Sequence, residues 1–567
     1  MVVRRFVIST LLVPVLAVGA IAQSASRGGA ASIEEAAARE WLTYLASDQL
    51  QGRATYTEGL GLAAAYIAQH LTEWGVTPAG DDGSYFQTVK VLGVRTTSRA
   101  SVTVEVNGRT RTFKDGEGMS LPRNMGGKQT LVADQVQFAG YGLSVPAADH
   151  DDYAGFDAKG KAVVFLGTAA PEALGNQTGR LFGARPRTAL DHGAIASLGP
   201  VRTGRFGRGG RGEQGQAAGA GRSARGAEGR ASGGGGGQGR GGAADNSDFT
   251  TVQRLGEPTP PAVTAEDAFF DFLFSGSDID YAALKQKAEK GEPLLPFALE
   301  GVRLTFNIDA DYTVVRTRYT RNVVGIVEGT DPKLKDTYVV YGAHYDHTGY
   351  RETAPAQGPA DDIINNGADD DGSGTVGIMA IARAFALGPR PKRSILFVWH
   401  AGEESGLLGS RYNADHPVVP LESMAAQINI DMIGRNRNDD PKEANTVYVV
   451  GSDRISSELH TINEEANDAL PKPLALDYEY NDPADPQSFY TRSDHYSYAA
   501  KGIPIIFFFT GTHPDYHRVS DTADKIIYEK LVRVARLAYE TGQRVANLDH
   551  MPQRDNKGPR AGKGKKG

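Results

Sequence analysis

Short apolar runs alternate with helix-like stretches through the second half of the chain. Runs rich in β-branched and aromatic residues occur at VRLTFNI, NVVGIVEG, TYVVYGAH, RSILFVWH, AAQINIDM, TVYVVG and IPIIFFF. Between several of them, apolar residues recur at helical spacing, as in GTVGIMAIARAFAL at 374–387. Strands that alternate with helices predict an α/β fold with a mostly parallel, mixed sheet and helices on both faces.

Two helices are expected near the N-terminus, ahead of this α/β rhythm. Ser32 and Glu35 have the spacing of a capping box, which predicts that a helix begins there. A second periodic stretch covers about 58–74 and ends before Gly75. We therefore assign 31–95 and 301–548 to one discontinuous domain.

The intervening region, 96–300, has a different pattern. TVEV, RTFK, TLVADQVQFAGYG and KAVVFLGTA are typical of strands, and glycine and aspartate turns separate them. This predicts an inserted β-rich domain. Within it, 202–247 is dominated by glycine and arginine and has almost no apolar residues, so we expect that segment to be disordered.

The arginines of 202–247 also resemble an RGG-type nucleic-acid binder. The segment has little besides Phe206 to stack on bases, and the whole chain has a net charge of −7. We therefore expect a passive surface insertion and no nucleic-acid partner.

The two ends of the chain have distinct compositions. Arg4 and Arg5 precede a short apolar run, and Ala20-Ile21-Ala22 offers a cleavage site, so 1–22 is predicted to be a signal peptide. An uncleaved membrane anchor is the alternative. We expect a secreted or periplasmic protein with no stable membrane insertion after cleavage. The end of the chain, 549–567, is expected to be a disordered basic tail.

Histidine and carboxylate residues follow the predicted strands at the point where each strand ends. His344 ends TYVVYGAH, Glu403 and Glu404 follow RSILFVWH, and Asp431 follows AAQINI. In an open parallel sheet, functional groups gather beyond the carboxyl ends of the strands. Asp370 precedes the 374–387 helix and His517 follows IPIIFFF, so both can reach the same edge.

Two imidazoles among several carboxylates indicate a metal site. Carboxylates repel one another in one pocket unless a positive charge lies among them, and this mixture of nitrogen and oxygen ligands suits zinc. If one carboxylate bridges two ions, the site is that of a two-metal hydrolase. The residues alone leave open which of Asp369, Asp370 and Asp371 bridges and whether His513 or His517 is the ligand. They also leave open which of Glu403 and Glu404 is the ligand and which is the base.

The segments AHYDH, NNGADDDGSG, GEESGLLGS, NIDMIG and HPDYHRVSDT together resemble the co-catalytic di-zinc aminopeptidase family, the secreted leucine-aminopeptidase-like exopeptidases. AGYGLSVPAADHDDYAGFDAKGKAVVFLG is similar to the protease-associated (PA) domain inserted in that family. The resemblance implies a zinc exopeptidase fold with two Zn²⁺ ions per chain.

The resemblance also implies a role for each candidate residue. Asp370 would bridge the two ions, His344 and Asp431 would complete one site, and Glu404 and His517 the other. Glu403 would be the general base. Asp346 would accept a hydrogen bond from His344 and set its tautomer. His347, His400, His495 and His513 are interpreted as structural.

The implied activity is hydrolysis of N-terminal residues from peptides or proteins with a free N-terminus. A glutaminyl cyclase and a carboxypeptidase of the same clan are the alternative enzymes. A non-enzymatic binding protein is the remaining alternative, and the presence of Glu403 argues against it.

Overall fold

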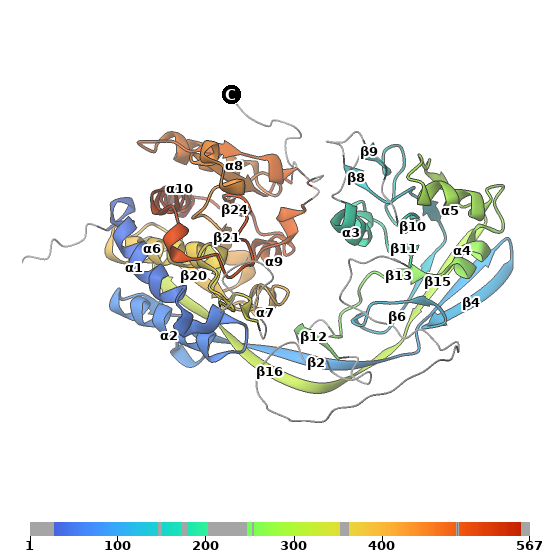
Figure 1. Ribbon diagram of the computed structural model, residues 1–567, viewed down its shortest axis with the longest axis horizontal. Coiled ribbons are helices and arrows are strands. Elements are labelled where there is room, and N and C mark those ends of the chain that lie inside the picture. The colour runs from blue at the N-terminus through green and yellow to red at the C-terminus, as the bar shows by residue number, and fades with distance from the viewer. Residues whose placement is uncertain are drawn as a thin grey trace, which may run out of the picture.

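The computed structural model describes residues 28–145, 150–168, 171, 178–201, 247–251, 255–351, 362–482, 485 and 487–556. The predicted signal peptide, nearly all of the Gly/Arg-rich segment and the tail beyond 556 lie outside this range. Two lobes are visible, each built on its own ten-stranded sheet (Figure 1).

The larger lobe contains the predicted α/β sheet. Its strand order is β12-β2-β16-β20-β17-β21-β24-β22-β23, and β1 pairs with β16. The four central strands β20, β17, β21 and β24 are parallel, whereas β16 and β22 flank them in the antiparallel sense. The prediction of a mostly parallel, mixed sheet is confirmed. The bounds of these strands are β1 (Thr77–Pro78), β2 (Phe86–Ser98), β12 (Ser247–Thr251), β16 (Ala310–Val327), β17 (Tyr338–His344), β20 (Ser394–His400), β21 (Met424–Ile430), β22 (Thr446–Val450), β23 (Ala475–Asp477) and β24 (Ile505–Phe509).

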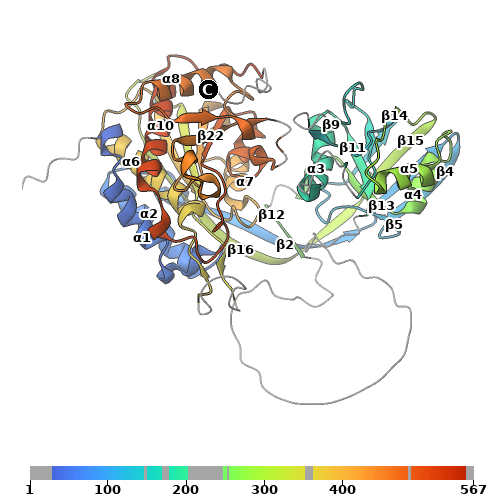
Figure 2. The same ribbon diagram turned by 45° about the horizontal axis from the view of Figure 1, so that its top comes forward.

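Helices cover both faces of this sheet (Figure 2). Along β17, Val339, Tyr341 and Ala343 point into the main core, whereas Val340 points into a smaller core on the opposite face. The main core lies beneath α1 (Glu35–Leu45), α2 (Glu58–Glu73), α6 (Gly374–Leu387), α8 (Ser457–Asp468) and α10 (Tyr528–Asn547). The opposite face is covered by α7 (Leu408–Asp415) and α9 (His495–Ala499). The continuous apolar runs of the sequence thus reflect strands that are buried on both faces.

The smaller lobe is the β-rich region expected from the sequence. Its strand order is β14-β7-β10-β11-β13-β5-β4-β3-β15-β6, and α3 (Thr178–Asp191), α4 (Asp267–Phe274) and α5 (Tyr281–Glu289) pack around it. The bounds of its strands are β3 (Ser101–Val106), β4 (Arg109–Asp115), β5 (Gly118–Ser120), β6 (Gln129–Ala133), β7 (Val136–Phe138), β10 (Ala162–Val164), β11 (Ala196–Pro200), β13 (Ala262–Ala265), β14 (Phe297–Ala298) and β15 (Val302–Ile308). The predicted domain boundaries are wrong at two strands. VRLTFNI, assigned to the α/β domain, is β15 and pairs with β3 and β6 of this second sheet. Conversely, β12 lies within the predicted insert but pairs with β2 of the first sheet.

Two long antiparallel strands connect the lobes. β2 and β16 pair from Phe86 with Val323 to Ser98 with Ala310, and Figure 1 shows them running from one lobe to the other. Their register shifts between Val314 and Arg316. Such a bulge bends a strand locally and increases its twist.

The predicted capping box at the first helix is wrong. The helix α1 begins at Glu35 with Glu34 as its N-cap, and no side chain caps it. Ser32 belongs to a preceding 3₁₀ turn, where its Oγ donates to the peptide oxygen of Gly29 at 2.8 Å. The serine thus satisfies a local turn and not the helix N-terminus.

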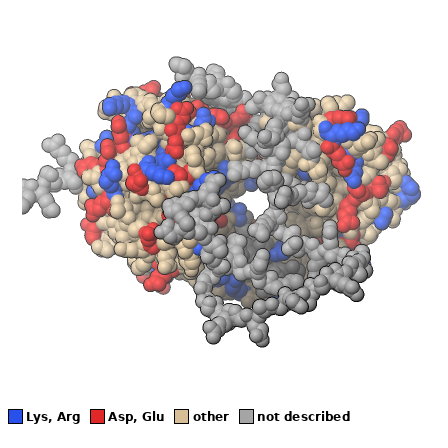
Figure 3. All heavy atoms as spheres, viewed as in Figure 1, with Lys and Arg blue, Asp and Glu red and all other residues tan. Residues whose placement is uncertain are grey.

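On the surface shown in Figure 3, acidic and basic side chains are interspersed over both lobes. Within the described residues, no helix is long and apolar enough to cross a membrane.

Candidate metal centre

The predicted ligands meet at one edge of the central sheet, as the strand directions require. β17 ends at His344, β20 ends just before the turn that carries Glu403 and Glu404, and β21 ends just before Asp431. Since these strands are parallel, their carboxyl ends lie side by side. Asp370 lies in the turn Ala368–Ser373 that precedes α6, and this turn lies above the same edge.

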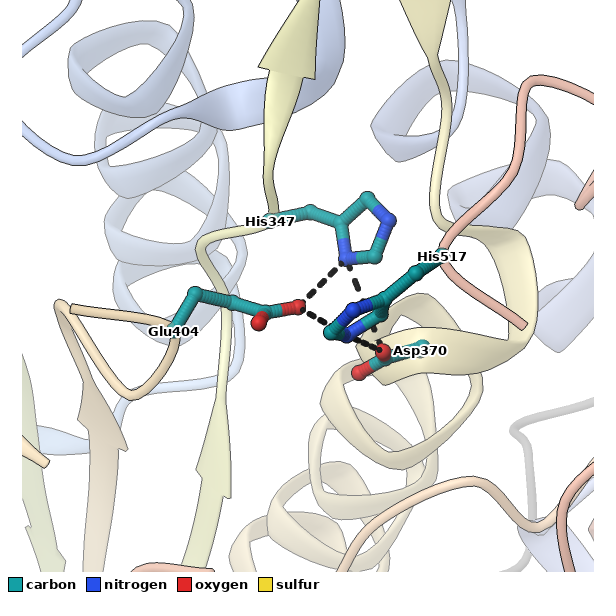
Figure 4. Close-up of side chains that lie close together, drawn as sticks. All are labelled: His347, Asp370, Glu404 and His517. Carbon is teal, nitrogen blue, oxygen red and sulfur yellow. Dashed lines mark ion pairs between the residues drawn. The ribbon is translucent and has the colours of Figure 1, made fainter. Parts of the chain in front are cut away.

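Four residues form the first cluster, which we call the His517 group: His347, Asp370, Glu404 and His517 (Figure 4). Glu404 Oε1 lies 3.0 Å from His347 Nδ1 and 2.9 Å from His517 Nε2. Asp370 Oδ2 lies 2.9 Å from the same His517 nitrogen. One potential ligand atom from each residue lies within 4.8 Å of the others, which is the spacing needed to surround one ion.

Three residues form the second cluster, the His344 group: His344, Asp371 and Asp431. His344 Nε2 lies 3.6 Å from Asp431 Oδ2 and 3.3 Å from Asp370 Oδ1. Asp370 therefore offers one oxygen to each group. Among the three adjacent aspartates that the residues had left open, Asp370 has the geometry of a bridging ligand.

Several buried atoms of these groups lack a hydrogen-bond partner among the residues that the structure describes. They are both ring nitrogens of His347, Oδ2 of Asp370, Oδ2 of Asp371 and Oε1 of Glu404. Unpaired polar atoms are costly to bury, so such a set indicates a missing partner. A divalent cation fits because every one of these atoms is a nitrogen or oxygen donor of the kind zinc accepts.

Hydrogen bonds behind the site hold its carboxylate residues in place. The carboxylate of Asp521 accepts from the backbone N–H groups of Asp369 and Asp370 and so fixes the turn that carries Asp370. Asp371 Oδ1 accepts from the N–H of Met432 at 3.1 Å. Ser493 Oγ donates to Asp431 Oδ2 at 2.7 Å.

Burial and charge shift the protonation of the site in the metal-free protein. Burial raises the pKa of Glu403 well above its usual value, and the neighbouring carboxylates, Glu404 first, raise it further. Although burial lowers the pKa of His517, the carboxylates of Asp370 and Glu404, each 2.9 Å from its Nε2, outweigh that effect and raise the pKa to about 10. In the metal-free protein, His517 thus holds a proton that a bound cation would displace.

Asp346 contacts His344 in a way that differs from the prediction. His344 Nδ1 lies 3.1 Å from the peptide oxygen of Asp346 and 3.7 Å from its carboxylate, so the hydrogen bond goes to the backbone. The carboxylate instead accepts from the backbone N–H of Glu403 at 3.1 Å and from Thr55 Oγ1 at 3.0 Å. Asp346 therefore holds the backbone of Glu403, and its peptide oxygen orients the imidazole.

His347 is the residue that sequence reasoning missed. The sequence pattern predicts a structural histidine, but its Nδ1 faces Glu404 within the His517 group. The available signal was its position three residues after His344 in AHYDH, at the end of a strand. His513, in contrast, contacts Asp369 at 3.3 Å and belongs to neither group.

Tyr516 lies against the His517 group. Its ring stacks on that of His517 with a centroid separation of 4.0 Å, and burial raises the pKa of its hydroxyl. Arg492 Nη2 lies 3.4 Å from the hydroxyl oxygen. A protonated hydroxyl beside a metal site can donate a hydrogen bond to a substrate oxygen.

Comparison with known proteins gives a family for the larger lobe. Residues 322–542 match the model of peptidase family M28. Leucine aminopeptidase 2 of Arthroderma otae is 26% identical over 288 residues, which cover 46% of this chain and 51% of that protein. The chain thus spans about half the length of this curated relative.

Solved structures similar to this chain include an aminopeptidase from Aneurinibacillus sp. strain AM-1, with 18% identity and a TM-score of 0.44. That match covers 92% of this chain and 96% of the other. The zinc aminopeptidase BSAP from Bacillus subtilis has 18% identity and a TM-score of 0.41, and the match covers 93% and 99% of the two chains. The sequence match is the informative one, because it spans β20, β17, β21 and β24 and every residue of both groups. Residues 322–542 are therefore a peptidase family M28 domain.

Proposed function

We propose that this protein is a zinc-dependent aminopeptidase that removes N-terminal residues from peptides and uses two metal ions. The observation that carries the proposal is the position of Asp370, which offers Oδ1 to the His344 group and Oδ2 to the His517 group. A carboxylate with one oxygen toward each group would bring two ions close together, as two-metal hydrolytic sites require. Membership of the domain in peptidase family M28 supports the reaction class.

Each side chain has a role in this proposal. His344 and Asp431 would hold one ion, Glu404 and His517 would hold the other, and His347 would contribute to the second site. When bound, the metal supplies Lewis acidity toward the scissile carbonyl and lowers the pKa of water.

Glu403 takes a proton from the attacking water and gives it to the leaving amine. Its raised pKa suits both steps, since the carboxyl group must accept and then release a proton. The surrounding carboxylates provide counter-charge for the substrate ammonium.

A mass-spectrometric digest tests the proposal. The substrates are one peptide with a free N-terminus, the same peptide acetylated, the same peptide with an amidated C-terminus, and a peptide that begins with Gln. Each is incubated with and without a zinc chelator. Stepwise loss from the free N-terminus that acetylation and the chelator both block is the expected result. Cleavage that survives the chelator, or that ignores acetylation, contradicts it.

Carboxypeptidase activity is the second candidate, and one observation favours it. A carboxypeptidase needs a cation for the terminal carboxylate, and Arg492, beside Tyr516, has a buried Nη1 without a hydrogen-bond partner in the described part of the chain. Loss of residues from the C-terminus, blocked by amidation, would select this activity. Loss of ammonia from the Gln peptide without cleavage would instead select a glutaminyl cyclase.

We also propose that the protein is exported after removal of residues 1–22, on the basis of their charged and apolar pattern. Sequencing of the N-terminus of the protein recovered outside the cytoplasm tests this. A mature chain that begins near Gln23 is expected, whereas an intact N-terminus in the cytoplasmic fraction contradicts it.

A further inference from the structure

A single arginine from the N-terminal region is buried directly behind the candidate metal centre. Arg53 ends the turn Asp48–Arg53 between α1 and α2, and only 1% of its surface is exposed. Its backbone has a φ of 48°, a left-handed conformation that is rare for a residue with a side chain. The turn is packed tightly: a Cβ on Gly52 would lie 2.4 Å from the peptide oxygen of Asn365.

The guanidinium of Arg53 donates to peptide oxygens from three parts of the chain. Its Nε donates to Tyr345 at 3.0 Å, its Nη1 to Asn366 at 2.7 Å, and its Nη2 to Gly367 at 2.8 Å. Nη1 also donates to Leu45 at the end of α1. In the described ranges no carboxylate forms an ion pair with it, so its donors are used on the backbone.

All of these acceptors except Leu45 belong to the two segments that carry metal-centre residues. Tyr345 lies between His344 and His347, and Gly367 lies three residues before Asp370. The main chain of Arg53 adds a further link, because its own oxygen accepts from the N–H of His347 at 3.1 Å. One side chain thus ties the segment 344–347 to the segment 366–370 from below.

The charge of Arg53 also faces the centre. Asp346, Asp521, Asp371 and Asp370 act on it electrostatically. Before a cation binds, these carboxylates repel one another, and a buried positive charge behind them offsets part of that repulsion.

We propose that Arg53 is a positioning residue that fixes the segments 344–347 and 366–370 against each other and so preorganises the metal centre before a cation binds. The planar guanidinium suits this role because its five donors can reach several oxygens in fixed directions, which a lysine ammonium cannot do. The inference rests on the proposed metal site but concerns the metal-free protein as well as the loaded one.

Arg393 provides a matched control for substitution. It is fully buried, and its guanidinium also donates to peptide oxygens, including that of His550 at 2.7 Å. It directly precedes β20, whereas the metal centre lies beyond the other end of that strand. Arg393→Met should therefore reproduce the general cost of losing a buried arginine without touching the centre.

The experiment compares the full-length wild type with Arg53→Met and Arg393→Met. In chelator-treated protein, amide hydrogen exchange of 344–347 and 364–371 should speed up at least tenfold in Arg53→Met and remain unchanged in Arg393→Met. Zinc affinity, measured by competition with a chromogenic chelator, should fall 10–100-fold in Arg53→Met alone. Equal effects of the two substitutions on exchange and on zinc affinity would overturn the proposal.

Arg53→Lys decides the matter if Arg53→Met does not fold. It keeps the charge but cannot span the three segments, so zinc affinity should fall by about tenfold. The activity loss should appear mainly as a lower kcat, with little change in KM. Wild-type exchange and zinc affinity in Arg53→Lys would overturn the proposal. A wild-type protein that binds no zinc would instead refute the proposed function, and the exchange experiment on metal-free protein would still test Arg53.

Discussion

The His344 group and the His517 group lie within one centre, yet the protein supports them very differently. In the His344 group, Asp431 accepts from Ser493, Asp371 accepts from the backbone, and the imidazole of His344 bonds to a peptide oxygen. In the His517 group, both ring nitrogens of His347 and one oxygen each of Asp370 and Glu404 are buried without a hydrogen bond among the described residues, whereas the His344 group has one such atom, Oδ2 of Asp371. The fold therefore supplies more of the polar partners of the first group than of the second.

The two groups also differ in exposure. The side chain of His344 is 1% exposed and that of His517 is 37% exposed. His344 ends a central strand, whereas His517 lies in a loop with a φ of 56°. His517 is therefore the more solvent-accessible of the two histidines, and its position is less constrained by regular secondary structure.

The largest expected effect is on kcat and comes from Glu403, the proposed base, which belongs to neither group of ligands. Glu403→Gln should lower kcat by about 10²–10⁴-fold, because it removes the proton acceptor and donor and no proposed ligand. Metal analysis of the purified variant should still find two zinc ions per chain. Loss of metal from this variant would contradict the assignment of Glu403 as the base.

Asp370→Asn tests whether one residue serves both groups. The amide is a weaker ligand than the carboxylate, so both ions should bind less tightly and activity should fall by at least 100-fold. Asp431→Asn is the matched variant, since it touches the His344 group alone. Titration with zinc should show two weakened sites in the first variant and one in the second; identical titration curves would refute the bridging role.

Ser493→Ala tests how much a hydrogen bond to a proposed ligand contributes to zinc affinity. It removes the hydroxyl that donates to Asp431 at 2.7 Å and leaves all ligands in place. The zinc affinity of one site should fall by about tenfold, while the other site stays unchanged. Isothermal titration measures both, and an equal loss at the two sites would show that the groups do not differ in this way.

The smallest expected effect is a pH dependence of the folding stability of the metal-free protein. Because the pKa of His517 is raised to about 10, the folded state binds a proton that the unfolded state releases at lower pH. This stabilisation is fully present below pH 6.5 and is lost as the pH rises to about 10. The loss should be modest, since solvent screens this exposed side chain.

Urea unfolding of chelator-treated protein at pH 6, 8 and 10 measures the dependence. His517→Gln is the control and should show a weaker decline over that range. A decline of the same size in both proteins would assign the effect to other groups.

Much of this centre could be predicted from the residues, because the ends of strands are readable in the sequence. A continuous apolar run indicates a strand buried on both faces, and parallel strands bring their carboxyl ends to one edge. That reasoning placed His344, Glu404 and Asp431 together although they are far apart in the chain. It failed for His347, because the sequence does not show whether a histidine just beyond a strand end turns toward the site or packs as a structural residue.

The inserted region was less predictable at its edges. Strands were recognisable from their composition, but pairing was not, so β15 appeared to continue the α/β pattern although it pairs with β3 and β6. Likewise, the spacing of Ser32 and Glu35 matched a capping box, yet Ser32 bonds to Gly29. In both cases the local sequence pattern was misleading, because another partner won: a long-range strand pairing for β15 and a local turn for Ser32.

By itself, the sequence determined the α/β sheet, the inserted β-rich region and the residue types at the metal centre, since hydrophobic period and strand ends are local properties of the chain. Only the tertiary structure decided which aspartate of 369–371 faces both groups, because that depends on the non-helical backbone of Asp370 and Asp371. It also decided which groups His347 and Arg53 contact. Those contacts are with distant segments, and the direction of a side chain in a turn has no periodic signature that a sequence can carry.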